Sequence, residues 1–165
     1  MRIQLDELDR VLLGYLQENA RISNAELARR VKLSPPGLQK RLRRLEQSGI
    51  IDRYVTLLNR EAVGYEMLCF IQVTMRRHEP HAISRFRLLV QDMPEVLECF
   101  SITGEHDYLL KIAVRNRKHL EYFLMEDLTP VPGMDTIRTS LVLSGIKETT
   151  AVSLAADTGG WQSSK

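Results

Sequence analysis

Residues 22–51, ISNAELARRVKLSPPGLQKRLRRLEQSGII, contain the start signals of two short helices separated by a tight turn. Ser23 followed by Glu26 is a capping-box pattern, which satisfies free N–H groups at a helix start. Ser34 is a favourable N-cap for the second helix, and Pro35 suits its first position because that residue needs no N–H partner. The spacing therefore predicts helix, turn and helix.

The second helix, predicted over residues 35–48, combines an apolar stripe with several cations. Leu38, Leu42 and Leu45 recur at helical spacing and face a core. Gly49 follows where a left-handed residue ends a helix. A short helix, a turn and a basic helix are typical of the helix-turn-helix motif, which reads the major groove of DNA.

The first of these helices is predicted over residues 23–31, and one further helix precedes it over residues 6–19. The three helices share a small core that includes Leu27. Residues 50–58 then have an extended pattern. They form either a short wing or the start of a linker that ends near Gly64.

The second half of the chain alternates between strand and helix patterns. Strands are predicted over 66–75, 95–103, 107–115 and 136–143, and helices over 81–92 and 117–128. The order βαββαβ indicates a ferredoxin-like arrangement, so the fold class is α+β with an N-terminal winged helix-turn-helix. The inward side chains of helix 81–92 are predicted to be Ile83, Phe86, Leu89 and Val90.

The first predicted strand is apolar on both faces, with Leu68 and Phe70 on one side and Cys69 and Ile71 on the other. Helices in this arrangement cover one face of the sheet, so the second face is predicted to be a dimerisation surface.

These patterns divide the chain into a DNA-binding domain with a linker strand, a regulatory domain and a loosely packed tail. The predicted bounds are residues 1–64, 65–150 and 151–165.

The charge is distributed unevenly. Residues 1–60 carry 12 Lys+Arg against 7 Asp+Glu, whereas residues 61–165 carry 11 against 14. This asymmetry indicates that only the front half meets nucleic acid.

No apolar run reaches membrane-spanning length and no signal-peptide pattern occurs, so a cytoplasmic, nucleoid-associated protein is expected. Cys69 and Cys99 have no paired spacing and are predicted to be reduced and buried.

Four stretches of the chain resemble the leucine-responsive regulatory protein/AsnC (Lrp/AsnC) family of transcription regulators. They read LDELDRVLLGYLQENARISNAELARRVKLS, RLRRLEQSGII, ITGEHDYLLKI and PVPGMDTIRTSLVL, and the resemblance covers about residues 3–150. It implies a winged helix-turn-helix domain, a linker strand and a regulatory βαββαβ domain. In the family that domain dimerises, assembles dimers into tetramers or octamers, and binds amino acids between subunits.

The partners expected from this reading are double-stranded DNA, further copies of the chain and a small-molecule effector, with no cofactor. On the reading helix, Gln39 is suited to adenine, Lys40 to guanine or phosphate, and Arg43 to phosphate. The candidate DNA contacts are Ser23, Ser34, Pro36, Gly37, Gln39, Lys40, Arg41, Arg43, Arg44 and Arg53.

The turn Gly104–Asp107, sequence GEHD, is the candidate effector site. Its backbone N–H groups suit a carboxylate and Asp107 suits an ammonium group, which is what recognition of a free amino acid requires. A plain turn with Asp107 capping its own backbone is the alternative. The resemblance places the effector pocket at this turn and matches a family threonine to Thr139, while His106 departs from the family pattern. The candidate residues are Gly104, His106, Asp107, Leu109 and Thr139.

Three alternatives to a DNA-binding regulator remain open. The segment His78-Glu79-Pro80-His81 resembles a metal site, although Pro80 breaks its register and an exposed connection is favoured. An enzyme resembling the siroheme decarboxylases shares the architecture, but the cationic reading helix argues against it. A pure assembly module would lack the salt dependence of DNA binding. No catalytic motif occurs, so the chain is predicted not to be an enzyme.

Overall fold

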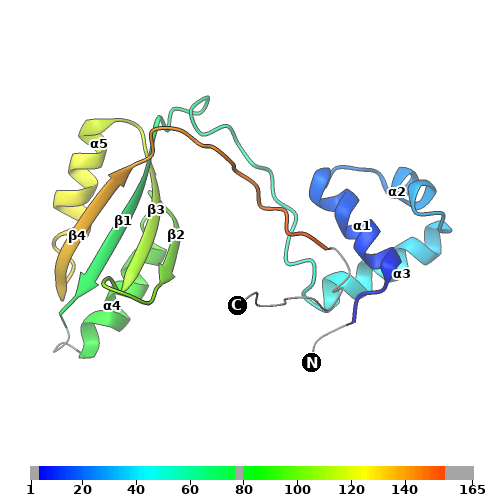
Figure 1. The fold of residues 1–165 in the computed structure, drawn as a ribbon, viewed down its shortest axis with the longest axis horizontal. Coiled ribbons are helices and arrows are strands. Elements are labelled where there is room, and N and C mark those ends of the chain that lie inside the picture. Colours follow the sequence, from blue (N-terminus) through cyan, green and yellow to red (C-terminus); the bar gives the residue numbers. More distant parts are fainter. Residues whose placement is uncertain (1–3, 77–79, 155–165) are drawn as a thin grey trace, which may run out of the picture. The chain divides into compact units, whose positions relative to one another are not determined.

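The computed structural model describes residues 4–76 and 80–154, and the chain divides into two compact units. The first unit contains the residues up to Leu57 together with the segment from Lys147 onward, and the second runs from Leu58 to Ile146. Figure 1 shows helices alone in the first unit and a sheet with helices in the second. The predicted domain boundary at residue 64 falls between the last helix of the first unit and the first strand of the second.

The first unit is built from α1 (Glu7–Glu18), α2 (Asn24–Arg30) and α3 (Pro35–Gln47). Leu12, Leu27, Leu38 and Leu45 are fully buried between these helices. The predicted apolar stripe of α3 is confirmed, because Leu42 is buried as well.

Side chains cap each helix of the first unit. The Ser23 hydroxyl accepts from the backbone N–H of Glu26 at 3.2 Å, and Ser34 accepts from that of Gly37 at 3.3 Å. The Glu26 carboxylate binds Arg29 and Arg30 instead of completing the predicted capping box. Its two cationic partners lie one turn away on the same helix, where ion pairs form readily.

The segment Asp52–Asn59 is extended but forms no strand, so the structure favours a linker over a hydrogen-bonded wing. It begins after Gly49, whose φ of 71° ends α3 as predicted.

The tail is better ordered at its start than the sequence suggests. Gln17 of α1 binds the backbone of Val152 through both ends of its amide, at 3.1 Å and 2.8 Å. Leu154 packs against the apolar core of this unit. The prediction of a loose tail is therefore wrong for these residues, and the remainder of the tail lies outside the described residues.

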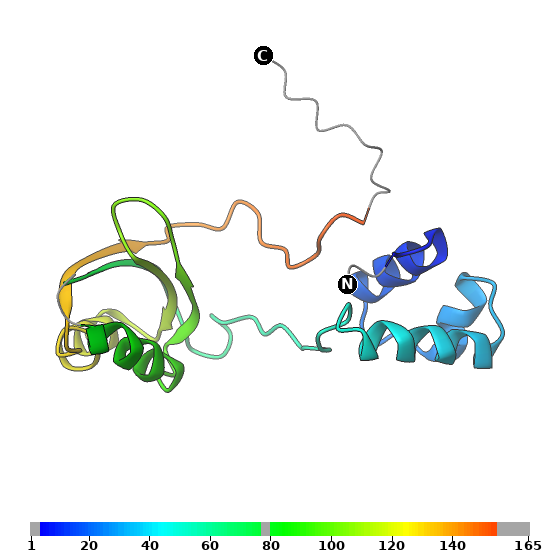
Figure 2. The same cartoon turned by 90° about the horizontal axis from the view of Figure 1, so that it is seen from below.

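The second unit confirms the predicted order βαββαβ. Its elements are β1 (Met67–Met75), α4 (Pro80–Gln91), β2 (Val96–Ser101), β3 (Tyr108–Val114), α5 (Arg117–Tyr122) continued by the π-helical η1 (Phe123–Leu128), and β4 (Met134–Leu141). The strands form one antiparallel sheet in the order β2-β3-β1-β4. Figure 2 shows α4 and α5 on the same side of this sheet.

The core of the second unit lies between the sheet and these helices. Ile71 and Val73 of β1 pack against Phe86 and Phe123, and all four are fully buried. The prediction that Ile83 and Leu89 face inward is wrong, because these side chains are 41% and 37% exposed. The buried stripe of α4 instead consists of Ala82, Phe86 and Val90, which recur every four residues.

Cys99 also departs from its prediction. It is exposed, whereas Cys69 is buried, and both thiols are free. The reason is topological, since Cys99 lies on the edge strand β2 while Cys69 lies inside the sheet.

The other face of the sheet carries the apolar side chains that the sequence placed there. Phe70 lies opposite Lys111, and Leu109 lies opposite Phe100, so all four point to the face away from the helices. Phe70 and Phe100 are 36% and 49% exposed. Leu68, on the same face, is only 7% exposed, so we call Phe70, Phe100 and Leu109 the open-face patch.

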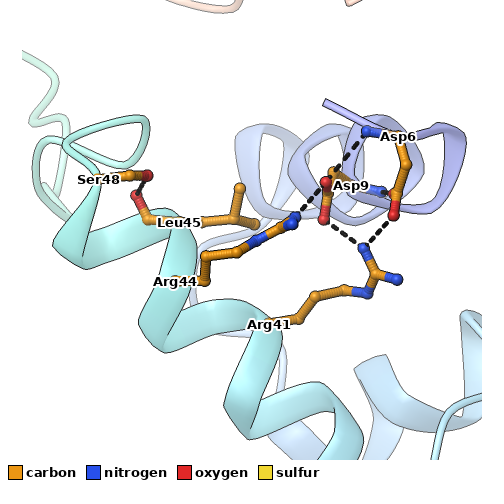
Figure 3. A network of polar contacts seen from close by, with 6 residues as sticks. All are labelled: Asp6, Asp9, Arg41, Arg44, Leu45 and Ser48. Carbon is orange, nitrogen blue, oxygen red and sulfur yellow. Dashed lines mark hydrogen bonds and ion pairs between the residues drawn. The ribbon is translucent and has the colours of Figure 1, made fainter. Parts of the chain in front are cut away.

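A buried carboxylate joins α1 to α3. Asp9 is fully buried and accepts hydrogen bonds from Arg44 and, at 2.7 Å, from Arg41 (Figure 3). Asp6 accepts from Arg41 at 2.5 Å and exchanges backbone hydrogen bonds with Asp9 in a complete capping box. We call Asp6, Asp9, Arg41 and Arg44 the α1–α3 clamp.

The clamp perturbs the ionisation of its members. The hydrogen bond from Arg41, aided by the backbone N–H of Asp9, lowers the pKa of the Asp6 carboxyl below its ordinary value. The Asp6 and Asp9 carboxylates raise the pKa of Arg41. Both shifts favour the charged forms of Asp6 and Arg41.

Asp9→Ala should lower the free energy of unfolding of the first unit by about 3 kcal/mol. The reason is that Arg41 and Arg44 lose a buried charged acceptor and α1 loses its capping box. Urea unfolding of the full chain, followed by helical circular dichroism, measures this loss. Asp6→Ala is the matched control and should cost only about 1 kcal/mol, because Asp9 still holds both arginines. Equal losses in the two variants would contradict the central place of Asp9.

Candidate nucleic-acid interface and effector turn

The exposed side of α3 is a polar strip opposite its leucine stripe. Pro36, Gln39, Lys40 and Arg43 are all exposed. An open hollow runs along this side of the helix, and its lining includes Pro36, Gly37, Gln39, Lys40, Arg43 and Gln47. The strip thus offers an amide, an ammonium and a guanidinium group to anything that lies in the hollow.

Gln47 is a residue of this strip that the sequence reasoning missed. It lies four positions after Arg43 and eight after Gln39, so it shares their face of the helix. Continuing that spacing to the last turn of α3 would have found it.

Gly37 has a local structural role. A Cβ at this position would lie 3.1 Å from the Ser34 hydroxyl, which caps α3. Glycine therefore leaves room for the cap.

The clamp separates the predicted arginine contacts into two kinds. Arg41 and Arg44 bind the carboxylates of α1, and their side chains are 25% and 47% exposed. Arg43 forms no ion pair within the part of the chain that the structure describes. Arg53 pairs with Asp52 at 3.4 Å, and both side chains are largely exposed, so that pair is weak. Contacts of these arginines with DNA stay predictions.

The two capping serines retain capacity for a ligand. Ser23 and Ser34 are exposed, and each uses its hydroxyl oxygen as an acceptor. Their hydroxyl protons are available as donors to a phosphate oxygen.

The GEHD turn is tied to the end of β1. The Asp107 carboxylate accepts from the backbone N–H of Met75 at 2.7 Å, and the Asp107 N–H donates to the carbonyl of Val73 at 2.9 Å. The His106 ring is 7% exposed, and its Nδ1 lies 2.9 Å from the Thr74 hydroxyl. Asp107 therefore caps a neighbouring strand, and not its own turn as the alternative supposed.

Gly104 has a φ of 118°, a conformation that side chains disfavour. Its neighbour Glu105 forms a loose ion pair with Arg138 at 3.7 Å. The His106–Asp107 end of the turn is thus held to β1 while its tip stays exposed.

The five predicted effector residues do not converge within one chain. Leu109 lies opposite Gln72 and points to the face away from the helices. Thr139 lies opposite Ile71 and points to the helix-covered face, where it is exposed because β4 is an edge strand.

The described residues do not support the metal site or the enzyme site considered from the sequence. His78 and Glu79 lie outside the described residues, and no cluster of metal-binding side chains occurs in the described ranges. His106 binds Thr74, and His119 binds Glu95 at 2.9 Å, so both histidines have partners inside the unit. Among the helices that the structure describes, none is long and apolar enough to cross a membrane.

Two family profiles match the chain. The profile "Winged helix-turn-helix DNA-binding" matches residues 5–52, and the profile "Lrp/AsnC ligand binding domain" matches residues 68–152. The first contains the whole of the clamp and α3, and the second contains the sheet and the GEHD turn.

Named relatives and solved structures agree with these profiles. The leucine-responsive regulatory protein of Escherichia coli is 39% identical over 144 residues, which is 87% of this chain and 88% of that protein. A transcriptional regulator of Neisseria meningitidis, solved as a complex with L-Met, is 39% identical with a TM-score of 0.87, covering 90% of this chain and 96% of the other. AsnC of Escherichia coli is 26% identical with a TM-score of 0.82, covering 90% and 99%.

Proposed function

Because this chain belongs to the Lrp/AsnC family of DNA-binding transcription regulators, we propose that α3 is its reading helix and that an amino acid controls it. The observation that carries the proposal is the exposed strip of α3, beside which the clamp pairs α3 with α1. The family consists of regulators, and the proposal contains no catalytic step.

In this proposal the residues of the strip have different tasks. Gln39 reads a base edge, because its amide can donate to and accept from adenine together. Lys40 reaches guanine or a phosphate, while Arg43 neutralises a phosphate and carries no sequence information. Ser23 and Ser34 fix the register by donating to phosphates at the starts of α2 and α3. A regulator of this kind works at the chromosome, so nucleoid association stays part of the proposal.

The clamp changes the expectation for two predicted contacts. Arg41 and Arg44 already neutralise Asp6 and Asp9, so a phosphate contact would have to compete with a buried carboxylate. We assign them to positioning α3, and we keep phosphate binding for Arg43.

The effector is an α-amino acid at the GEHD turn. The regulator of Neisseria meningitidis is described as a complex with L-Met, and a regulatory protein of Mycobacterium tuberculosis that is 30% identical is described as complexed with L-methionine. One oxygen of Asp107 holds Met75, and the carboxylate keeps lone pairs for an ammonium group.

Two copies of the chain complete this site in the proposal. Leu109 and Thr139 point to opposite faces of one sheet. One small ligand can therefore contact a leucine and a threonine at these positions only where they come from two different subunits. The open-face patch gives such copies an apolar surface to bury. A two-fold dimer also presents two reading helices, which favours a palindromic operator.

Gln39→Ala should relax base preference at one position per half-site, costing about 1–3 kcal/mol of discrimination. Selection of bound sequences from a random duplex pool, with wild type and variant in parallel, measures this. Arg43→Gln should weaken specific and random duplexes alike and reduce the salt slope by about 0.9 per phosphate. Arg44→Gln is its matched neighbour and should lower thermal stability instead. Equal effects of Gln39→Ala on specific and random DNA would refute the base-reading role.

Asp107→Asn should lower the affinity for L-methionine at least tenfold, since the amide still accepts from Met75 but offers no charge to an ammonium group. Isothermal titration of the full chain with a panel of amino acids measures this. Glu105→Gln is the control, because its exposed carboxylate contacts Arg138 only loosely. Wild-type binding by Asp107→Asn would contradict the assignment.

Phe70→Lys should shift the chain toward monomer, because it places a charge in the open-face patch. Light scattering after size-exclusion chromatography reports the mass. Leu88→Lys, at a side chain of α4 that is 65% exposed, is the control and should leave the mass unchanged. A dimer that tolerates Phe70→Lys would place the interface elsewhere.

A further inference from the structure

The turn between α2 and α3 contains an unusual backbone conformation. Lys32 has a φ of 54°, and it alone among the described residues other than glycine has a positive φ. The left-handed region brings Cβ close to the neighbouring carbonyl oxygen, so glycine adopts it far more readily than lysine.

The end of α3 shows what the same geometry usually requires. At α2, the N–H of Leu33 binds the carbonyl of Ala28 at 2.9 Å, and the N–H of Lys32 binds that of Arg29 at 3.3 Å. At α3, Ile50 binds Leu45 and Gly49 binds Glu46, both at 3.0 Å. Both helices therefore end in a Schellman motif, with glycine in the left-handed position of one and lysine in that of the other.

No contact among the described residues of the unit accounts for the lysine. Its side chain is exposed, and it takes part in no ion pair within the described ranges. The nearest acidic residue in the sequence, Glu26, already binds Arg29 and Arg30. The ammonium group of Lys32 thus has no ion-pair partner among the described residues.

Lys32 lies at the edge of the hollow along α3, which is the proposed DNA interface. Leu33, the next residue, lines the hollow along α3, and Ser34 then caps the helix. The start of this 13-residue helix presents the positive end of its dipole. A lysine there acts as a flexible point charge suited to a phosphate.

We propose that Lys32 binds a DNA backbone phosphate at the edge of the major groove, and that this contact keeps lysine where glycine would be less strained. The proposal rests on α3 being the reading helix. It adds a phosphate contact in the turn, which precedes in sequence the residues of α3 to which DNA contacts are assigned.

Lys32→Gly separates stability from binding because the two should change in opposite directions. The midpoint of thermal unfolding should rise by about 4 °C, since the strain is relieved. Affinity for duplex DNA should fall roughly three- to tenfold, for the duplex selected by wild type and for a scrambled duplex alike. The slope of log affinity against log salt should fall by about 0.9 for each phosphate that the variant no longer neutralises.

Two further variants separate the charge from the backbone. Lys32→Gln keeps the strained conformation and should lose affinity and slope as Lys32→Gly does, whereas Lys32→Arg should keep both. Lys118→Gln, at an exposed lysine of α5 in the second unit, removes the same charge and should change neither.

The outcomes distinguish this proposal from the one it rests on. A wild-type chain that binds duplex DNA, together with a Lys32→Gln variant of equal affinity and slope, overturns the role of Lys32 alone. A wild-type chain that shows no salt-sensitive duplex binding overturns the role of α3 and that of Lys32 with it. A higher unfolding midpoint in Lys32→Gly with unchanged binding would also overturn the phosphate contact.

Discussion

The first unit depends on the burial of one carboxylate. Asp9 has no exposed surface, and a buried charge is stable only when charged or polar groups surround it. Arg41 and Arg44 supply that surrounding from successive turns of α3, while Asp6 closes the network from the start of α1. The direction of α3 is therefore fixed at two points of its length by electrostatics, in addition to its leucine stripe. A reading helix needs this rigidity, because base contacts tolerate little misplacement.

The same constraint decides which cations are available to DNA. Arg41, Arg43 and Arg44 belong to one basic run, yet two of them are neutralised within the fold. Arg29 and Arg30 on α2 share the single carboxylate of Glu26, which offsets one of their two charges. The described ion pairs leave Lys40 and Arg43, in the middle of α3, as its unpaired cations. Counting basic residues in the sequence overestimates the number of phosphate contacts, and hence the steepness of the salt dependence.

In the second unit, strand order has a comparable effect on the effector turn. β1 lies between β3 and β4, so the turn that precedes β3 meets the far end of β1. Asp107 and His106 then bind backbone and side-chain groups of that end. Because β4 is on the opposite edge from β2, Thr139 is exposed there, and its register places it on the other face from Leu109. This division favours a ligand site shared between subunits.

The sequence by itself determined the elements of this protein and their order. Caps at Ser23 and Ser34, the leucine spacing of α3 and the alternating strands are local signals, which residue type and spacing alone reveal. The resemblance to the family came from the same local motifs. Only the tertiary structure decided which arginines are paired, which face Leu109 and Thr139 occupy, and that Ile83, Leu89 and Cys99 are exposed. It also revealed that Lys32 stands in a left-handed position. These properties depend on partners distant in the sequence or on backbone angles, and residue spacing specifies neither.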